Sequence, residues 1–292
     1  MGSADRSANL AGSLWMVAAM AGFAVEDLFL KIAARTVPVG EVLIVFGAVG
    51  MVAFAVLARR RGDRVLSPAI LSRPILLRAV FEMAGRLFHT LALAVVPLAL
   101  VSALLQATPL VVVAGAALLF GERVGWRRWA AIAVGFAGVL IVLRPGTEAF
   151  SAVALLAVAG MLGFAGRDLA TRAAPPTLSS LALGVYGFAA MVPAGAAVMA
   201  ATGTAPVVPG AGAAAALAGA TAVGVGAYYA LTRAMRTGEV SVVTPFRYTR
   251  LLFGVALAAA LLGERIDAAT ILGSLLIVGS GLYTLWRARR AA

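Results

Sequence analysis

The stretch Gly22-Phe23-Ala24-Val25-Glu26-Asp27-Leu28 returns as Gly163-Phe164-Ala165-Gly166-Arg167-Asp168-Leu169, with five of the seven positions identical at an offset of 141. A second pair, Leu119-Phe120-Gly121-Glu122-Arg123 and Leu261-Leu262-Gly263-Glu264-Arg265, repeats at an offset of 142. Apolar helices often resemble one another by chance, but charged residues that match at a nearly constant offset seldom do. The repeat therefore predicts two related halves, residues 1–146 and 147–292.

The composition excludes an ordinary soluble protein. Of the 292 residues, 62% are hydrophobic and 12% are charged, and the mean hydropathy is +1.01. Soluble domains have about 45–50% apolar and about 25% charged residues. The chain has no cysteine and one histidine, which argues against disulfides, a thiolate or histidine metal site, and a catalytic triad. We therefore expect no metal and no other cofactor.

Apolar runs of roughly 20 residues, the length that a helix needs to cross a bilayer, recur along the whole chain. The first run is too long for the apolar region of a signal peptide and is predicted to be retained. The sequence thus predicts an all-α polytopic membrane protein. Its ten predicted transmembrane helices cover residues 10–34, 39–57, 75–95, 98–120, 126–143, 150–169, 178–201, 211–235, 240–262 and 268–286.

An odd number of spans in each half determines how the halves are related. With five spans per half, the second half enters the membrane from the side opposite to the first. The halves are then related by a pseudo-two-fold axis in the membrane plane, the inverted repeat of many secondary transporters. This 5+5 arrangement predicts alternating access, with a substrate site near the midplane between the halves.

The arginines predict the orientation. If the N-terminus is cytoplasmic, 16 basic residues lie in inner segments and 3 lie in outer ones, which are Arg35, Arg144 and Arg265. This bias places both termini in the cytoplasm. The net charge of +12 is then explained by topology and by contact with anionic lipid, and nucleic-acid binding is excluded because no soluble basic domain exists.

Several motifs carry a family resemblance. The first half contains Gln106-Ala107-Thr108-Pro109-Leu110, Gly121-Glu122-Arg123 and Arg144-Pro145-Gly146, and the second contains Thr244-Pro245-Phe246-Arg247-Tyr248 and Gly263-Glu264-Arg265. In these motifs the chain resembles the EamA family of the drug/metabolite transporter superfamily, over essentially its whole length. The resemblance implies a 5+5 inverted repeat, a central cavity, and transport of small metabolites across the inner membrane. Within the family, the sequence looks most like amino-acid exporters, including those of the YddG type.

Ionisable residues inside predicted spans are candidates for gating or coupling, because a charge in the bilayer is costly unless it faces protein or water. Asp27 and Lys31 are four residues apart, as are Asp168 and Arg172, so each pair can form a salt bridge on one helix. The alternative for Asp27 or Glu26 is proton coupling. The gating or coupling candidates are Glu26, Asp27, Lys31, Glu82, Arg86, Asp168 and Arg247.

The third predicted span has a charged face. Arg78, Glu82 and Arg86 follow one another at intervals of four, so Glu82 can be neutralised on its own helix. The stripe is predicted either to pack against a neighbouring helix or to line a cavity. His89 can titrate near neutral pH and bind a substrate carboxylate or amine, although it can also be a structural hydrogen-bonding group.

The ninth predicted span is the second candidate for a binding surface. Pro245 interrupts the helix and can leave backbone groups for a ligand. A buried arginine can bind a carboxylate in bidentate fashion, and we expect Arg250 to be the substrate anchor. Arg247 and Arg250 are three residues apart, so one of them can pair with Glu26 or Asp27 while the other faces the cavity. For each aromatic residue, lipid-facing packing is the alternative to substrate contact. The full set of predicted substrate contacts is His89, Arg250, Tyr248, Phe88, Gln106, Tyr228, Tyr229, Trp15 and Phe23.

The sequence predicts a secondary transporter that exports small metabolites, with aromatic or other neutral amino acids as the expected substrates. No G-x-x-x-x-G-K-[ST] phosphate loop occurs, so nothing supports ATP-driven transport. The alternatives are an uptake carrier for a metabolite such as S-adenosylmethionine, a drug efflux carrier, a channel, and an intramembrane enzyme, which the scarcity of catalytic groups disfavours. Proton coupling stays open, and the chain is expected to be a monomer unless the glycines of the fifth and tenth spans mediate a dimer. Glu122 and Glu264 are predicted to cap helices or to form structural ion pairs.

Overall fold

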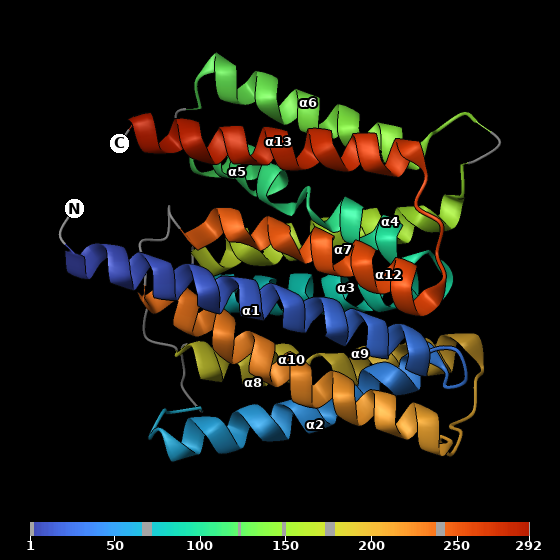
Figure 1. Cartoon of the computed structure of the whole chain (residues 1–292). Coiled ribbons are helices and arrows are strands. Elements are labelled where there is room, and N and C mark those ends of the chain that lie inside the picture. Colours follow the sequence, from blue (N-terminus) through green and yellow to red (C-terminus); the bar gives the residue numbers. More distant parts are fainter. Residues whose placement is uncertain are drawn as a thin grey trace. The chain divides into compact units, whose positions relative to one another are not determined.

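The computed structural model describes residues 3–65, 72–121, 124–147, 150–172, 179–237 and 243–291, and within these ranges every regular element is a helix (Figure 1). Among these described residues, eight helical segments are long and apolar enough to cross a membrane, so the chain is a multi-pass membrane protein. The predicted number of ten spans and the cytoplasmic position of the termini stay predictions. The helices are α1 (Ser3–Ala33), α2 (Val39–Arg60), α3 (Arg73–Val95), α4 (Leu98–Leu105), α5 (Thr108–Phe120), α6 (Trp126–Leu143), η2 (Ala152–Ala154), α7 (Leu155–Arg172), α8 (Ser180–Ala189), α9 (Met191–Thr202), α10 (Ala211–Thr237), η3 (Thr244–Tyr248), α12 (Thr249–Leu262) and α13 (Ala268–Ala291).

Two of the spans predicted to be continuous are broken helices. The span predicted at 98–120 divides into α4 and α5, and the one at 178–201 divides into α8 and α9. Proline has no N–H to bond the carbonyl four residues earlier, and its ring clashes with that carbonyl. Pro109 and Pro193 are each four residues beyond the last residue of the preceding helix, Leu105 and Ala189. Each break therefore falls where the proline removes a helical hydrogen bond.

The chain forms two compact units, and α1 and α10 each contribute to both. Unit 1 comprises Met1–Leu28, Pro97–Ala154 and Gly226–Ala292, and unit 2 comprises Phe29–Val96 and Leu155–Val225.

In unit 2, α3 packs along α7, and α2 packs against α8 and α9. Small residues allow these backbones to approach closely. A Cβ on Gly163 of α7 would lie 2.5 Å from the Cα of Gly85 on α3, and a Cβ on Gly195 of α9 would lie 2.3 Å from the carbonyl oxygen of Gly40 on α2. These glycines are therefore required by helix packing.

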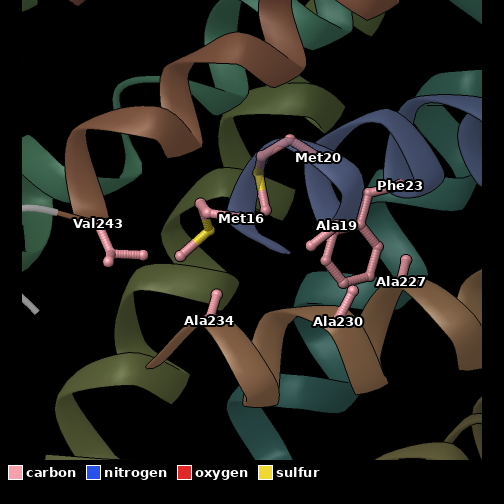
Figure 2. Packing of buried hydrophobic residues seen from close by; sticks show 8 residues of the cluster. All are labelled: Met16, Ala19, Met20, Phe23, Ala227, Ala230, Ala234 and Val243. Atoms are coloured by element: carbon pink, nitrogen blue, oxygen red, sulfur yellow. The ribbon is translucent and has the colours of Figure 1, made fainter. Parts of the chain in front are cut away.

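In unit 1, α6 packs along α13, and two glycines of the fifth and tenth predicted spans, Gly138 and Gly273, lie inside this packing. A Cβ on Gly138 would lie 2.7 Å from the carbonyl oxygen of Gly273. A second core joins α1 to α10 (Figure 2), and its buried members are Met16, Ala19, Met20, Phe23, Ala227, Ala230, Ala234 and Val243.

The repeat is visible in the helix boundaries of unit 1. α6 begins at Trp126 and α13 begins at Ala268, 142 residues later. The helix before each of them ends in a left-handed glycine, Gly121 with a φ of 67° and Gly263 with a φ of 64°. Only glycine adopts this conformation without strain, so the glycine of both Gly-Glu-Arg motifs is explained by helix termination. Glu122 and Arg123 lie outside the described residues.

Candidate functional site

The predicted site residues are divided between the two units. Unit 1 contains Trp15, Phe23, Glu26, Asp27, Gln106, Tyr228, Tyr229, Arg247, Tyr248 and Arg250, and unit 2 contains Lys31, Glu82, Arg86, Phe88, His89 and Asp168.

A buried ion pair joins α1 to α12 in unit 1. Nη2 of Arg250 lies 2.6 Å from Oδ2 of Asp27, and the two side chains are 18% and 2% exposed. The guanidinium also lies over the ring of Phe23, 5.3 Å from its centroid, in a cation–π contact. Nε of Arg250 is buried and has no hydrogen-bond partner among the described residues. The expectation that one of Arg247 and Arg250 pairs with Glu26 or Asp27 is confirmed for Arg250 and Asp27. The role of Arg250 as substrate anchor stays a prediction.

The break around Pro245 is a short 3₁₀ helix, η3, that leads into α12. Gln106 lies in the break between α4 and α5 and is buried. Its Nε2 donates to the carbonyl oxygen of Tyr248 at 3.0 Å and, more weakly, to that of Arg247 at 3.5 Å. The backbone carbonyls that were expected to be available to a ligand therefore already accept from Gln106.

The aromatic residues of unit 1 lie in different environments. Phe23 is a core residue that faces Ala227 and Ala230 of α10 (Figure 2), and Tyr228 packs against the same core. Trp15 is 38% exposed and contacts Tyr229 edge to face, with the ring centroids 6.3 Å apart. An edge-to-face pair of partly exposed rings forms an apolar wall that can contact either lipid or an aromatic substrate.

In unit 2, Glu82 lies at the centre of a group of arginines. Its carboxylate is 3.4 Å from Nη2 of Arg78, 3.7 Å from Nε of Arg86 and 3.3 Å from Nη1 of Arg167. The predicted neutralisation of Glu82 on its own helix is confirmed, but Arg167 of α7 was not foreseen. Because α7 supplies the third arginine, the stripe on α3 packs against a helix, which was one of the two predicted arrangements.

Two of these arginines make further contacts. Arg86 lies near three aromatic rings, with its guanidinium carbon 5.7–5.9 Å from the ring centroids of Phe46, Phe164 and Phe188. Arg167 pairs with Asp168 at 2.8 Å. Asp168 was expected to pair with Arg172, whose side chain lies outside the described residues. The contacts with the aromatic rings and with Asp168 therefore direct Arg86 and Arg167 toward other residues of unit 2.

His89 and Lys31 both lie at the far end of α3 from Arg78. His89 is 1% exposed, and its ring contacts Phe164 at a centroid distance of 5.6 Å. Lys31 donates through Nζ to the carbonyl oxygens of Leu93 and Val96, at 2.9 and 2.6 Å. A cation stabilises the negative end of a helix, so Lys31 acts as a C-terminal cap of α3.

Acidic side chains occupy helix N-termini in unit 1. Glu264 accepts from the backbone N–H groups of Leu98 and Ala99, at 2.8 and 3.1 Å, and so caps α4 as predicted. Asp267 caps α13 by accepting from the N–H of Thr270 at 2.7 Å, and it pairs with Arg144. Burial raises the pKa of the Asp267 carboxyl, but the hydrogen bonds from Thr270 and Arg144 outweigh it, so the pKa lies below its ordinary value.

The described residues contain no group of three or more histidine, cysteine or acidic side chains arranged to hold a metal ion. An open groove on α6 and α13 contains none of the predicted site residues; it is lined by Trp126, Arg127, Ala130, Ala131, Val134, Ser280 and Tyr283. The two buried charge groups, Asp27 with Arg250 and Glu82 with its arginines, are therefore the candidates for chemistry.

Known proteins share both the sequence and the fold of this chain. The chain is 29% identical to a riboflavin transporter of Rhizobium johnstonii, over 72% of this chain and 69% of that protein. It is 22% identical to an S-adenosylmethionine uptake transporter of Rickettsia prowazekii, over 75% and 74%. It is 26% identical to a pseudopaline exporter of Pseudomonas aeruginosa, over 91% and 93%.

A solved crystal structure matches the fold with a TM-score of 0.63, at 20% identity, over 96% of this chain and 98% of that one. The three sequence relatives are named as transporters and not as enzymes. All three are bacterial proteins, which is consistent with an inner-membrane location. The model of the EamA-like transporter family matches residues 10–144 and again residues 151–286. This chain, a multi-pass membrane transporter, belongs to the EamA-like transporter family.

Proposed function

We propose that this protein is a secondary transporter that exports amino acids with aromatic or other neutral side chains, by alternating access between repeats 1–146 and 147–292. The observation that carries the proposal is the buried ion pair between Asp27 and Arg250, whose guanidinium retains an unsatisfied Nε. Ionisable residues inside transmembrane segments are rare, pair with one another and mark substrate pathways and proton relays.

The charges of this pair match those of a zwitterion. If a substrate enters between the two side chains, its carboxylate can bind the guanidinium of Arg250 through two N–H groups, and its ammonium can bind Asp27. One buried ion pair then becomes two, and no net charge enters the membrane. A substrate with a net charge would leave one charge uncompensated, which is costly in a medium of low dielectric constant. The geometry therefore favours zwitterions.

The surroundings of the pair favour an apolar side chain on the substrate. The ring of Phe23 lies against the guanidinium of Arg250, so an apolar group of a substrate bound there contacts an aromatic surface. Trp15 and Tyr229 form an edge-to-face pair nearer the start of α1, about 18 Å from Asp27 along the helix. In unit 1, the further candidate contacts of the proposed site are Trp15, Phe23, Gln106, Tyr228, Tyr229 and Tyr248. Phe88 and His89 belong to unit 2, and their contact with substrate stays a separate prediction.

The proposal is tested by counterflow in proteoliposomes that contain one amino acid at high concentration, with radiolabelled amino acids outside. We expect saturable accumulation of aromatic or neutral amino acids. Arg250→Ala should lower that accumulation by about tenfold or more, because a charged hydrogen bond is lost. The matched control is Arg144→Ala, which breaks an ion pair with Asp267 at an exposed helix end and should leave counterflow unchanged. Equal counterflow in the two variants would place the substrate elsewhere.

The names of the relatives support a second candidate substrate class. Two of them are transporters of riboflavin and of S-adenosylmethionine, so both compounds belong in the same counterflow screen. Exchange of either compound without exchange of any amino acid would refute the proposed substrate. It would still support a carrier mechanism, because a carrier exchanges its substrate across the membrane. Repeating the assay with an imposed pH gradient separates proton antiport, with Asp27 as the coupling group, from facilitated diffusion.

A further inference from the structure

Gln106 and Tyr248 occupy equivalent positions in the two repeats. The offset of 142 that relates α6 to α13 and Gly121 to Gly263 also carries residue 106 to residue 248. Gln106 follows the last residue of α4, and Tyr248 is the last residue of η3, directly before α12. Each residue therefore lies at the break that precedes the corresponding helix of its repeat, α5 for Gln106 and α12 for Tyr248.

The two equivalent residues touch each other. Nε2 of Gln106 donates to the carbonyl oxygen of Tyr248 at 3.0 Å. In an object with two-fold symmetry, equivalent points approach each other only near the axis. The packing of α6 against its equivalent α13 in the same unit agrees with an axis at this place. The hydrogen bond therefore lies close to the pseudo-two-fold axis of the repeat.

The contact itself is not symmetric. The side chain of Gln106 reaches the backbone of residue 248, whereas the hydroxyl of Tyr248 is buried without a hydrogen-bond partner among the described residues. This hydroxyl lies against α13, where a Cβ added to Gly281 would come within 1.7 Å of it. Leaving a buried hydroxyl unsatisfied destabilises a conformation. In this conformation the Gln106 donor is thus satisfied and the Tyr248 donor is not.

We propose that Gln106 and Tyr248 alternate as donors when the transporter changes sides. In an inverted repeat, the two access states are related by an exchange of the conformations of the halves. The exchange gives the opposite state the reciprocal contact, in which the Tyr248 hydroxyl donates to the backbone carbonyl of Gln106 and the Gln106 amide releases residue 248. Gln106 is then a positioning residue that acts through the two helix breaks. This inference rests on the alternating access of the proposed function.

The pair is tested through the populations of the two states. The chain has no cysteine, so Ser102→Cys gives one reporter thiol without further engineering. Ser102 is 3% exposed on α4, its hydroxyl makes no hydrogen bond to a described residue, and a Cβ on Gly254 of α12 would lie 2.3 Å from it. We expect slow maleimide labelling of this thiol in the state described here and faster labelling when α4 and α12 rearrange.

The two donors should shift the labelling rate in opposite directions. In lipid nanodiscs, Gln106→Ala should raise the rate by about three- to tenfold, the effect of one hydrogen bond, and Tyr248→Phe should lower it. Gln106→Glu keeps the size of the side chain but cannot donate when ionised, so it should behave like Gln106→Ala. Melting temperatures of all variants show whether each one is folded.

Shifts in the same direction, or parental labelling by Gln106→Glu, would overturn the alternating pair. The assay contains no substrate, so its result is independent of amino-acid counterflow by the parent protein. Opposite shifts without counterflow refute the proposed substrate alone, and counterflow without opposite shifts refutes only this inference.

Discussion

Replacing Glu82 with glutamine removes the negative charge from a group of three arginines and leaves the shape of the side chain almost unchanged. Glu82 is 5% exposed, and the nitrogen atoms of the arginines lie 3.3–3.7 Å from its carboxylate. At an effective dielectric constant of about 20, one such contact corresponds to an attraction of about 5 kcal/mol, which the desolvation of the carboxylate opposes. In Glu82→Gln, the three positively charged arginines stay close together without the negative charge that offsets their mutual repulsion.

Breaking a buried ion pair by removing one partner costs about 3–5 kcal/mol. Arg167 is 21% exposed and can turn toward solvent, so we expect the lower part of this range, a loss of about 3 kcal/mol in the free energy of unfolding. Total stabilities are about 5–15 kcal/mol, so the loss is readily measured by equilibrium unfolding in detergent micelles.

Two further variants make this test specific. Glu41→Gln removes a carboxylate that accepts from the exposed N–H of Val207, and it should cost less than about 1 kcal/mol. Adding Arg86→Met to Glu82→Gln should restore part of the loss, because it removes one like charge from among Phe46, Phe164 and Phe188. A change below about 1 kcal/mol for Glu82→Gln alone would refute the electrostatic reasoning.

Three other changes have defined outcomes in thermal unfolding. Glu264→Ala removes the cap of α4 and should cost about 1–2 kcal/mol, whereas an unchanged melting temperature would show that water replaces the cap. Gly281→Ala should lower the free energy of unfolding by about 1–3 kcal/mol, because the added Cβ collides with Tyr248. The control Gly279→Ala, which has open space around it, should raise the free energy of unfolding by about 0.5–1 kcal/mol. Equal effects of the two substitutions would contradict the contact between Gly281 and Tyr248. The pKa of Asp267 is lower in the folded state than in the unfolded state, so its contribution to stability is present at neutral pH and is lost as the pH falls through the folded-state pKa. Asp267→Asn should remove this part of the loss of stability in acid. An unchanged dependence of the melting temperature on pH would argue against the pair with Arg144.

Most of the spans could be read from the sequence because they are long apolar runs that end near a glycine, a proline or a charge. The break at Gln106 was missed, since the run from 98 to 120 is apolar throughout. The signal was present, because Pro109 cannot bond the carbonyl of Leu105, the last residue of α4. Apolar content reports membrane insertion, whereas the position of a proline reports where an inserted helix is interrupted.

The charged residues could be placed on helices from the sequence, but their partners on other helices could not. Spacing by four placed Arg78 and Arg86 beside Glu82, because that geometry belongs to one helix. Arg167 was missed since its contact depends on the packing of α3 against α7. The constant offset of the repeat could have paired Gln106 with Tyr248 as equivalents, but only the fold shows that these equivalents touch.

The pair of Asp27 and Arg250 is proposed to open and admit a zwitterion, and the most direct measurement compares substrates that each lack one of the two charged groups. Proteoliposomes loaded with an aromatic amino acid are offered the same amino acid, its methyl ester, which lacks the carboxylate, or its N-acetyl derivative, which lacks the ammonium. We predict saturable counterflow of the amino acid and at least about tenfold less for either derivative, because each derivative leaves one member of the pair without a partner. Equal counterflow of all three compounds, or none of the amino acid, would contradict the account.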